Sequence, residues 1–110
     1  MWLLIIDEST IKQAVGLLQQ AAPGSTIIVF GSCARGEITA DSDLDLLVVE
    51  PRVTSRHEEM VRLRKVLRPL GVPADVLVAS KDTFEYWSDT PNTIYYEVAR
   101  EGRVFDAALP

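Results

Sequence analysis

Apolar residues recur along the chain with two different spacings, one typical of helices and one typical of strands. Helical spacing predicts a first helix that Asp7 or Ser9 can cap and that runs to about Ala22. Pro23-Gly24 ends this helix, and the β-branched run 26–30 predicts the first strand.

A second strand is predicted over 43–49, because Pro51 ends an apolar run there. A short helix over 33–38 and a polar loop over 39–42 connect the two strands. Residues two apart on a strand point to the same face, so Asp43 and Asp45 share one face. The opposite face carries Leu44, Leu46 and Val48.

The second half of the chain continues the alternation of helix and strand. Ser55 and Glu58 fit a capping box, and the helix that follows sends Met60, Leu63, Val66, Leu67 and Leu70 to the core. A turn at 71–73 leads to a third strand, 74–79, on which Asp75 shares a face with Leu77 and Ala79.

The last segment predicts two helices and an edge strand. Asp82 and Glu85 fit a second capping box that opens a short helix through Trp87. Thr90-Pro91 is expected to start the last helix, and 103–106 is expected to form a terminal edge strand. The last helix should bury Ile94, Tyr95, Val98 and Ala99 and end at Gly102. This order favours an α/β (α+β) fold, a small mixed β-sheet flanked by helices.

Composition places the chain among ordinary globular proteins. At 110 residues it is expected to form a single domain over 1–110, with 47% hydrophobic and 25% charged residues. A net charge of −5 argues against binding long nucleic acid through its phosphates, and a single cysteine excludes an internal disulfide. The apolar start, 1–6, is far shorter than the roughly 20 residues of a membrane span and lacks a basic leader, so a cytoplasmic location is expected.

One stretch, 31–50, carries the candidate chemistry. It opens with Gly31-Ser32, where exposed backbone N–H groups suit a phosphate, and it ends in the strand that begins with Asp43 and Asp45. Two carboxylates on one face repel each other unless a cation lies between them, and such oxygen ligands suit magnesium with substrate phosphates. The stretch therefore predicts a magnesium–nucleotide site.

The same residues resemble a known signature. Gly31-Ser32, ten intervening residues and then Asp43-Leu44-Asp45 resemble the DNA polymerase beta-like nucleotidyltransferase superfamily. Within it, the run from Gly31 through Glu37 resembles the minimal nucleotidyltransferases of prokaryotes. The resemblance follows the order of elements along the whole chain, and its specificity rests on 31–50 and Asp75.

The resemblance implies roles for individual residues. Asp43 and Asp45 would bind two Mg²⁺ ions, and Asp75 would complete the metal site on the nucleophile side and accept its proton. Gly31 and Ser32 would hold the β- and γ-phosphates of ATP, and Arg35 would neutralise the leaving group. Ser42 has two interpretations of about equal weight, a phosphate contact or a loop hydroxyl that binds nearby backbone.

The resemblance also implies a function, the transfer of AMP from ATP to a hydroxyl. Because 110 residues leave no room for an acceptor domain, the acceptor surface is expected on a second copy of the chain or on another protein. The resemblance also implies a partner, because minimal nucleotidyltransferases of this kind are typically antitoxins that bind, and in some cases adenylylate, a HEPN ribonuclease toxin. The alternatives are a binding module that acts by sequestration and an antibiotic-type enzyme with a small-molecule acceptor.

Other features of the sequence favour structural roles. Ile5 and Ile6 are expected to pack on the first helix rather than form a partner surface, and Cys33 to be a small packing residue. Arginines 56, 62, 64 and 68 favour a solvated face over a nucleic-acid patch. Aromatic residues at helical spacing, Tyr86, Trp87, Tyr95 and Tyr96, favour a core role over stacking on a base.

Overall fold

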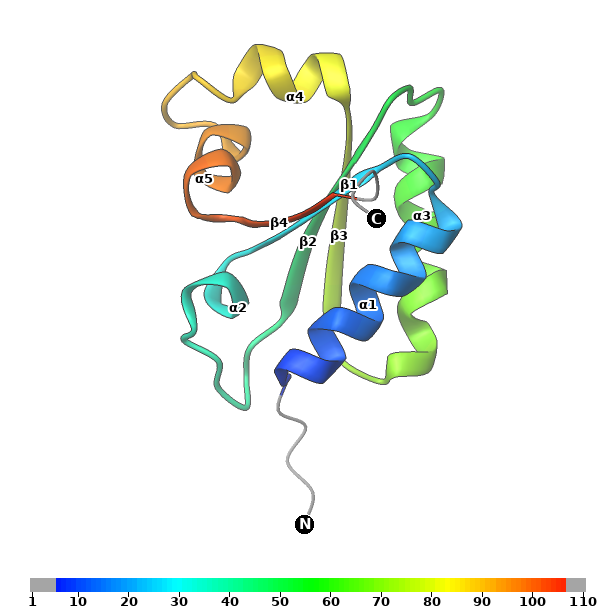
Figure 1. Ribbon diagram of the computed structural model, residues 1–110, viewed down its shortest axis with the longest axis vertical. Helices are drawn as coiled ribbons and strands as arrows, with labels where there is room; N and C mark the ends of the chain where they lie inside the picture. Colours follow the sequence, from blue (N-terminus) through cyan, green and yellow to red (C-terminus); the bar gives the residue numbers. More distant parts are fainter. Residues whose placement is uncertain (1–5, 107–110) are drawn as a thin grey trace.

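Within residues 6–106, the part of the chain that the computed structural model describes, four strands form one mixed sheet (Figure 1). The strand order is β3-β2-β1-β4; β1 is antiparallel to both of its neighbours, and β2 is parallel to β3. The elements in chain order are α1 (Glu8–Ala21), β1 (Thr26–Phe30), α2 (Ser32–Arg35), β2 (Leu44–Glu50), α3 (Arg56–Leu67), the 3₁₀ turn η1 (Arg68–Leu70), β3 (Ala74–Ser80), α4 (Lys81–Trp87), α5 (Ile94–Glu101) and β4 (Arg103–Asp106). The predicted order, the mixed sheet and the terminal edge strand are confirmed.

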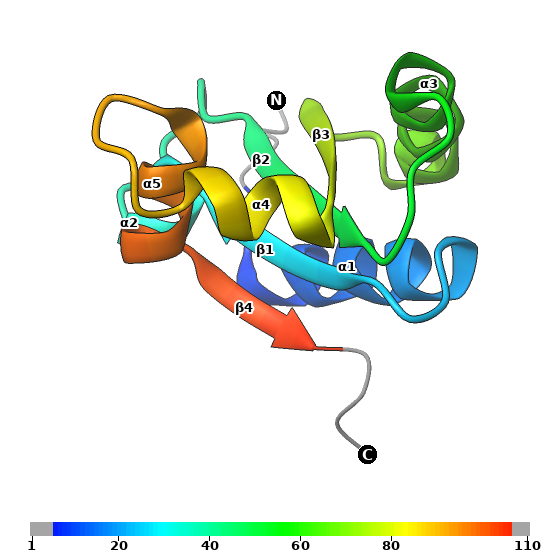
Figure 2. The same ribbon diagram turned by 90° about the horizontal axis from the view of Figure 1, so that it is seen from above.

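Helices cover both faces of this sheet, so its strands are apolar on both sides. Figure 2 shows α1 and α3 on one side and α4 and α5 on the other. The larger core cluster joins α1 and α3 to the face of β2 that carries Leu44, Leu46 and Val48. A smaller cluster joins Leu47 and Val49 on the opposite face to side chains of α4 and α5. The predicted division of β2 between two faces is confirmed.

The N-cap of α1 and the burial of Ile6 and Cys33 agree with the predictions from the sequence. Asp7 is the N-cap of α1, and its carboxylate accepts a hydrogen bond from the backbone N–H of Thr10 at 2.8 Å. Ile6 is only 1% exposed and belongs to the larger core cluster, whereas Ile5 lies outside the described residues. Cys33 is buried there too, as predicted.

Several predicted boundaries are wrong by a few residues. α2 covers only Ser32–Arg35, because Gly36 adopts a left-handed conformation at φ 74° and ends it. β2 begins at Leu44, so that Asp43 lies just before the strand. Ser55 caps α3 through the N–H of Glu58 at 3.4 Å, which is one half of the expected capping box.

The two C-terminal helices also start where other hydroxyls cap them. β3 continues to Ser80, whose Oγ accepts from the Thr83 N–H at 3.1 Å, so Asp82 is not the cap of α4. A turn with Asn92 at φ 70° delays α5 to Ile94, where Thr93 rather than Thr90 caps it. Val98 is buried as predicted, but Ile94 and Ala99 are exposed, because α5 buries only a narrow stripe against the sheet.

No helix in the described part, residues 6–106, has the length and apolar character needed to cross a membrane.

Candidate functional site

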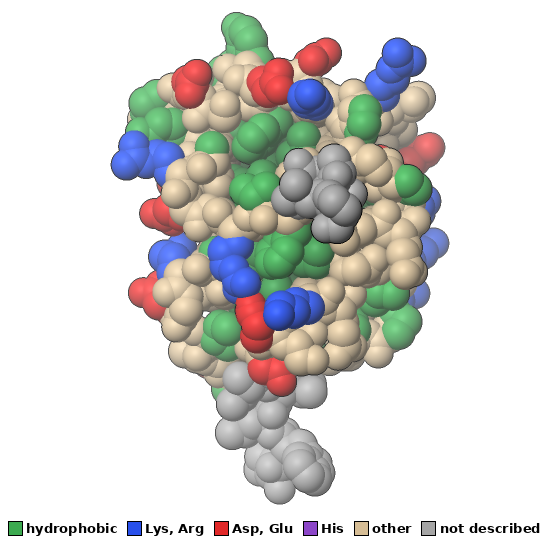
Figure 3. Space-filling model, viewed as in Figure 1, with side chains coloured by type: hydrophobic (Ala, Val, Ile, Leu, Met, Phe, Trp, Pro, Cys, Tyr) green, Lys and Arg blue, Asp and Glu red, His purple; other side chains and the backbone are tan. Residues whose placement is uncertain are grey.

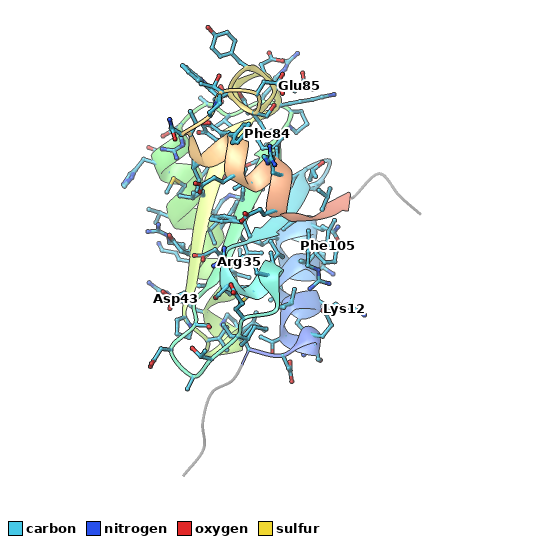
Figure 4. The ribbon with its side chains drawn as sticks, turned by 90° about the vertical axis from the view of Figure 1, so that its left-hand side faces the viewer. Lys12, Arg35, Asp43, Phe84, Glu85 and Phe105 are labelled. Carbon is cyan, nitrogen blue, oxygen red and sulfur yellow. The ribbon has the colours of Figure 1, made fainter. Side chains whose placement is uncertain are left out.

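The predicted site residues meet at one end of the sheet because of how the strands pair. β1 runs antiparallel to β2, so its last residue, Phe30, lies opposite Asp45 near the start of β2. β2 runs parallel to β3, and Asp45 is the register partner of Asp75. The turn after β1 and the starts of β2 and β3 therefore share one end, where Figure 4 shows Arg35 and Asp43.

Gly31 lies directly against the carboxylate of Asp45. Its backbone adopts φ 72° and ψ −154°, a conformation that side chains other than hydrogen rarely allow. A Cβ placed on Gly31 would collide with Oδ2 of Asp45. The Cys33 thiol also donates to the Asp43 carbonyl oxygen at 3.4 Å, which ties α2 to the residues before β2. The absence of a side chain at Gly31 therefore leaves room for the carboxylate of Asp45.

Asp45 is partly buried among other carboxylates. Burial first, and then the negative charges of Asp75 and Asp43, raise the pKa of Asp45 above its ordinary value, and Arg35 opposes this shift. Burial and the charge of Asp45 also raise the pKa of the Cys33 thiol, which agrees with a packing role. The site thus concentrates negative charge that a cation would stabilise.

Asp75 is exposed, and its carboxylate forms an ion pair with an arginine that the sequence pattern did not identify as its partner. Nη2 of Arg64, on α3, donates to Oδ1 of Asp75 at 2.9 Å. Among residues 6–106, no three carboxylate, histidine or cysteine side chains converge as a ready-made metal site. The donors nevertheless fit a hard divalent cation, since Asp43, Asp45 and Asp75 offer only carboxylate oxygens and Gly31 leaves Asp45 room.

The two serines of the site are linked by a hydrogen bond. Oγ of Ser32 donates to Oγ of Ser42 at 3.3 Å, and Ser42 also accepts from the backbone N–H of Thr39 at 2.8 Å. Ser42 therefore makes the loop contact that was one of its two predicted interpretations. A phosphate contact from Ser32 or Ser42 stays a prediction.

Arg35 is engaged by two glutamates in this structure. Its Nε donates to Glu37 at 2.5 Å, and its Nη1 lies 3.7 Å from Glu101 at the end of α5. The hydrogen bond to Glu37 is the main reason why the pKa of Arg35 is raised. Glu37 lies two residues along the chain, but Glu101 comes from a distant helix, and no local pattern identifies it as a partner.

The three arginines of α3 and Arg68 of η1 are exposed, as predicted, but the three in α3 also have specific partners. Arg56 donates from Nε to the carbonyl oxygen of Val78 at 2.8 Å, and Arg62 binds Glu59 through two hydrogen bonds of 2.7 and 2.8 Å. Since Arg64 binds Asp75, two arginines of α3 contact residues of β3 and the third contacts a glutamate of α3 itself.

The aromatic residues of α4 lie away from the site. Tyr86 is 73% exposed and packs edge-to-face on Trp87, which is itself 40% exposed, so the predicted core role is wrong for both residues. Below α4, where Figure 3 shows a group of hydrophobic side chains, a hollow of about 430 Å³ lies at the opposite end of β1 and β2 from Asp45. Its lining consists of Gly24, Thr26, Val49, Pro51, Lys81, Phe84 and Glu85.

Glu50, at the far end of β2, gives a prediction about pH. Its Oε2 is buried and receives no hydrogen bond from the described residues. Burial and the neighbouring Glu59 raise the pKa of Glu50 to about 7 from an ordinary value of 4.5. Since the folded protein holds this proton more tightly than the unfolded chain, stability should fall as pH rises from 4.5 to about 7.

Glu50→Gln should remove that fall, which we expect to be about 1 kcal/mol after solvent screening of a half-buried group. Urea unfolding at pH 5 and pH 7.5 measures it, with Glu58→Gln, an exposed glutamate of α3, as the matched control. Equal pH slopes for wild type and Glu50→Gln would contradict this assignment. Arg62 lowers the pKa of Glu59, an effect that acts below pH 4.5 and does not interfere.

Comparisons with known proteins agree with this geometry. Residues 11–100 match the family model described as "Nucleotidyltransferase domain", and the chain belongs to this family. The chain is 34% identical over 104 residues to a Methanocaldococcus jannaschii protein named "putative protein adenylyltransferase"; the match covers 89% of this chain and 96% of that protein. The protein is therefore a nucleotidyltransferase enzyme.

Two solved structures resemble the fold. One, named "putative minimal nucleotidyltransferase", is 31% identical with a TM-score of 0.60, over 87% of this chain and 92% of that one. The other, a "putative nucleotidyltransferase" from Sulfolobus solfataricus, is 20% identical with a TM-score of 0.61, over 88% and 77%. The predicted nucleotidyltransferase fold is confirmed.

Proposed function

We propose that this nucleotidyltransferase transfers AMP from ATP, with magnesium, to a hydroxyl group on a partner protein, and that the partner is a HEPN-type ribonuclease toxin. The observation that supports the donor half best is the contact between Gly31 and Asp45 at the end where Asp45 and Asp75 pair. The name of the Methanocaldococcus jannaschii relative supports a protein as the acceptor.

In the proposed reaction, the acceptor oxygen attacks the α-phosphorus of ATP. A bond forms between that oxygen and phosphorus, the bond from the α-phosphorus to the bridging oxygen breaks, and pyrophosphate leaves with its electron pair. Bound magnesium would stabilise the charge on the attacking and leaving oxygens. The products are an AMP-modified acceptor, pyrophosphate and a proton.

The residues of this chain divide the remaining tasks. Asp43 and Asp45 would hold the cation at the start of β2, and Asp75 would complete the metal site and accept the proton of the attacking hydroxyl. The N–H groups after Gly31 and the hydroxyl of Ser32 bind the phosphates. Arg35 pairs with Glu37 and Glu101 at an exposed position. It would contact the leaving group by giving up one of these ion pairs for a phosphate oxygen.

The acceptor half of the proposal concerns a second polypeptide. The resemblance to antitoxin nucleotidyltransferases supports a HEPN-type toxin, and the exposed position of Asp75 leaves its carboxylate accessible to a residue of a partner protein. Adenylylation of a residue that the toxin needs would neutralise it. The protein would then act as the antitoxin of a toxin–antitoxin pair.

The test is to purify the protein together with a candidate HEPN-type partner and to add ATP and magnesium. We expect intact-mass spectra of the partner to show AMP-sized increments with the wild type and none with Asp43→Asn. Asp41→Asn is the matched control, since Asp41 is an exposed carboxylate of the same loop with no assigned role.

Three outcomes separate the parts of the proposal. Full transfer by Asp43→Asn would overturn the assignment of the site. Neutralisation of the partner that survives loss of Asp43 and Asp45 would favour sequestration over modification. A protein that forms no complex with the partner, and leaves it unmodified, would overturn the proposed acceptor.

A further inference from the structure

Arg64 reaches its partner around the edge of the sheet. α3 packs, through Leu63 and Leu67, against the face of β3 that carries Val76 and Val78. Asp75 alternates with Val76 on β3 and so belongs to the opposite face, which it shares with its register partner Asp45. β3 is an edge strand, with α3 lying beside that edge in Figure 2, so the 2.9 Å bond between Arg64 and Asp75 passes around it.

The charges around Asp75 explain why this cation matters. Asp43, Asp45 and Asp75 bring three carboxylates to one end of the sheet, and the charges of Asp75 and Asp43 already act on Asp45. Arg35 also approaches this end, but Glu37 and Glu101 engage it. Within residues 6–106, Arg64 is thus the cation that is bonded directly to one of the three carboxylates.

We propose that Arg64 is a positioning residue that holds Asp75 in the metal-free protein and competes with a divalent cation for its carboxylate. The inference rests on the proposed function, since it takes Asp43, Asp45 and Asp75 as the metal ligands. It is supported by the hydrogen bond from Nη2 of Arg64 to Oδ1 of Asp75 at 2.9 Å, which occupies the carboxylate that the metal would need. Asp75 joins the other two carboxylates when it exchanges the guanidinium for the metal.

Competition between Arg64 and a metal ion for Asp75 predicts the direction in which metal affinity changes when Arg64 is replaced. A cation that binds Asp75 must break an exposed ion pair and approach a fixed positive charge, and both effects weaken binding. Removing the charge of Arg64 should therefore tighten metal binding that involves Asp75, by about two- to fivefold, the range that an exposed ion pair provides. A residue that merely supported the fold would leave this affinity unchanged or lower it.

The test uses Mn²⁺ alone, titrated into the nucleotide-free protein and followed by electron paramagnetic resonance and calorimetry. We expect Arg64→Gln to bind Mn²⁺ about two- to fivefold more tightly than wild type. Arg64→Met should do the same, and Arg64→Lys, which keeps the charge, should resemble wild type. Arg62→Gln is the matched control, because Arg62 is on the same helix with 48% side-chain exposure against 47% for Arg64 and pairs with Glu59 instead.

The outcomes distinguish this inference from the proposed function. Unchanged or weaker Mn²⁺ binding in both Arg64→Gln and Arg64→Met would overturn the competition, while Asp45→Asn still weakens binding and supports the metal site. Mn²⁺ binding that Asp45→Asn leaves unaffected would overturn both. Failure to modify any partner protein, with the Mn²⁺ results as expected, would overturn only the proposed acceptor.

Discussion

Asp45→Asn is expected to reduce AMP transfer by about 10²- to 10³-fold, the cost of removing one group that stabilises charge in a transition state. It should also make the metal-free protein more stable. Asparagine has nearly the same shape as aspartate but removes the charge that burial, Asp75 and Asp43 disfavour at neutral pH. We expect a gain of roughly 0.5 kcal/mol, the scale of a solvent-screened charge interaction.

The two readouts need different conditions. Transfer is measured with labelled ATP and magnesium, and stability by urea unfolding in EDTA, with Asp41→Asn as the control for both. Because the pKa of Asp45 is raised in the folded protein, the wild type loses stability relative to Asp45→Asn as pH rises above the ordinary aspartate range. The gain should vanish in acid, where wild-type Asp45 is protonated in both states. A variant that transfers AMP normally, or that is less stable than wild type in EDTA, would contradict the role of Asp45.

Gly31→Ala is expected to reduce transfer by a similar factor, about 10²-fold, and to weaken Mn²⁺ binding, although it changes no charged group. The new Cβ would collide with Oδ2 of Asp45, so either the carboxylate or the turn must move. The conformation at φ 72° and ψ −154° adds a strain of about 1–3 kcal/mol for any residue with a Cβ.

Gly36→Ala separates strain from displacement. Gly36 lies at the other end of α2 with φ 74°, but a Cβ there would meet no atom within 4 Å. It should cost about 1 kcal/mol of stability through its left-handed backbone and leave transfer and Mn²⁺ binding intact. Circular dichroism melting and the transfer assay compare the two variants. If Gly36→Ala lost as much activity as Gly31→Ala, backbone strain alone would explain both, and the contact with Asp45 would not matter.

The sequence by itself determined the order of the helices and strands and which side chains of each strand point to which face of the sheet. Alternation along 44–49 assigned Leu46 and Val48 to one face and Leu47 and Val49 to the other, because strand periodicity is a local property of the backbone. The same reasoning located the Gly31-Ser32 turn and the carboxylates Asp43, Asp45 and Asp75 at strand ends. Boundaries were less certain, since any nearby hydroxyl can cap a helix, and Ser80 and Thr93 did so instead of Asp82 and Thr90.

Only the tertiary structure decided which charges meet. The pairing of Asp45 with Asp75 follows from the parallel register of β2 and β3. The ion pairs of Arg64 with Asp75 and of Arg35 with Glu101 join elements that no local period connects. A sequence pattern specifies the direction in which a side chain leaves its own strand or helix. The partner of a charged side chain depends on how elements pack around the sheet edge, and that arrangement is fixed by the whole core.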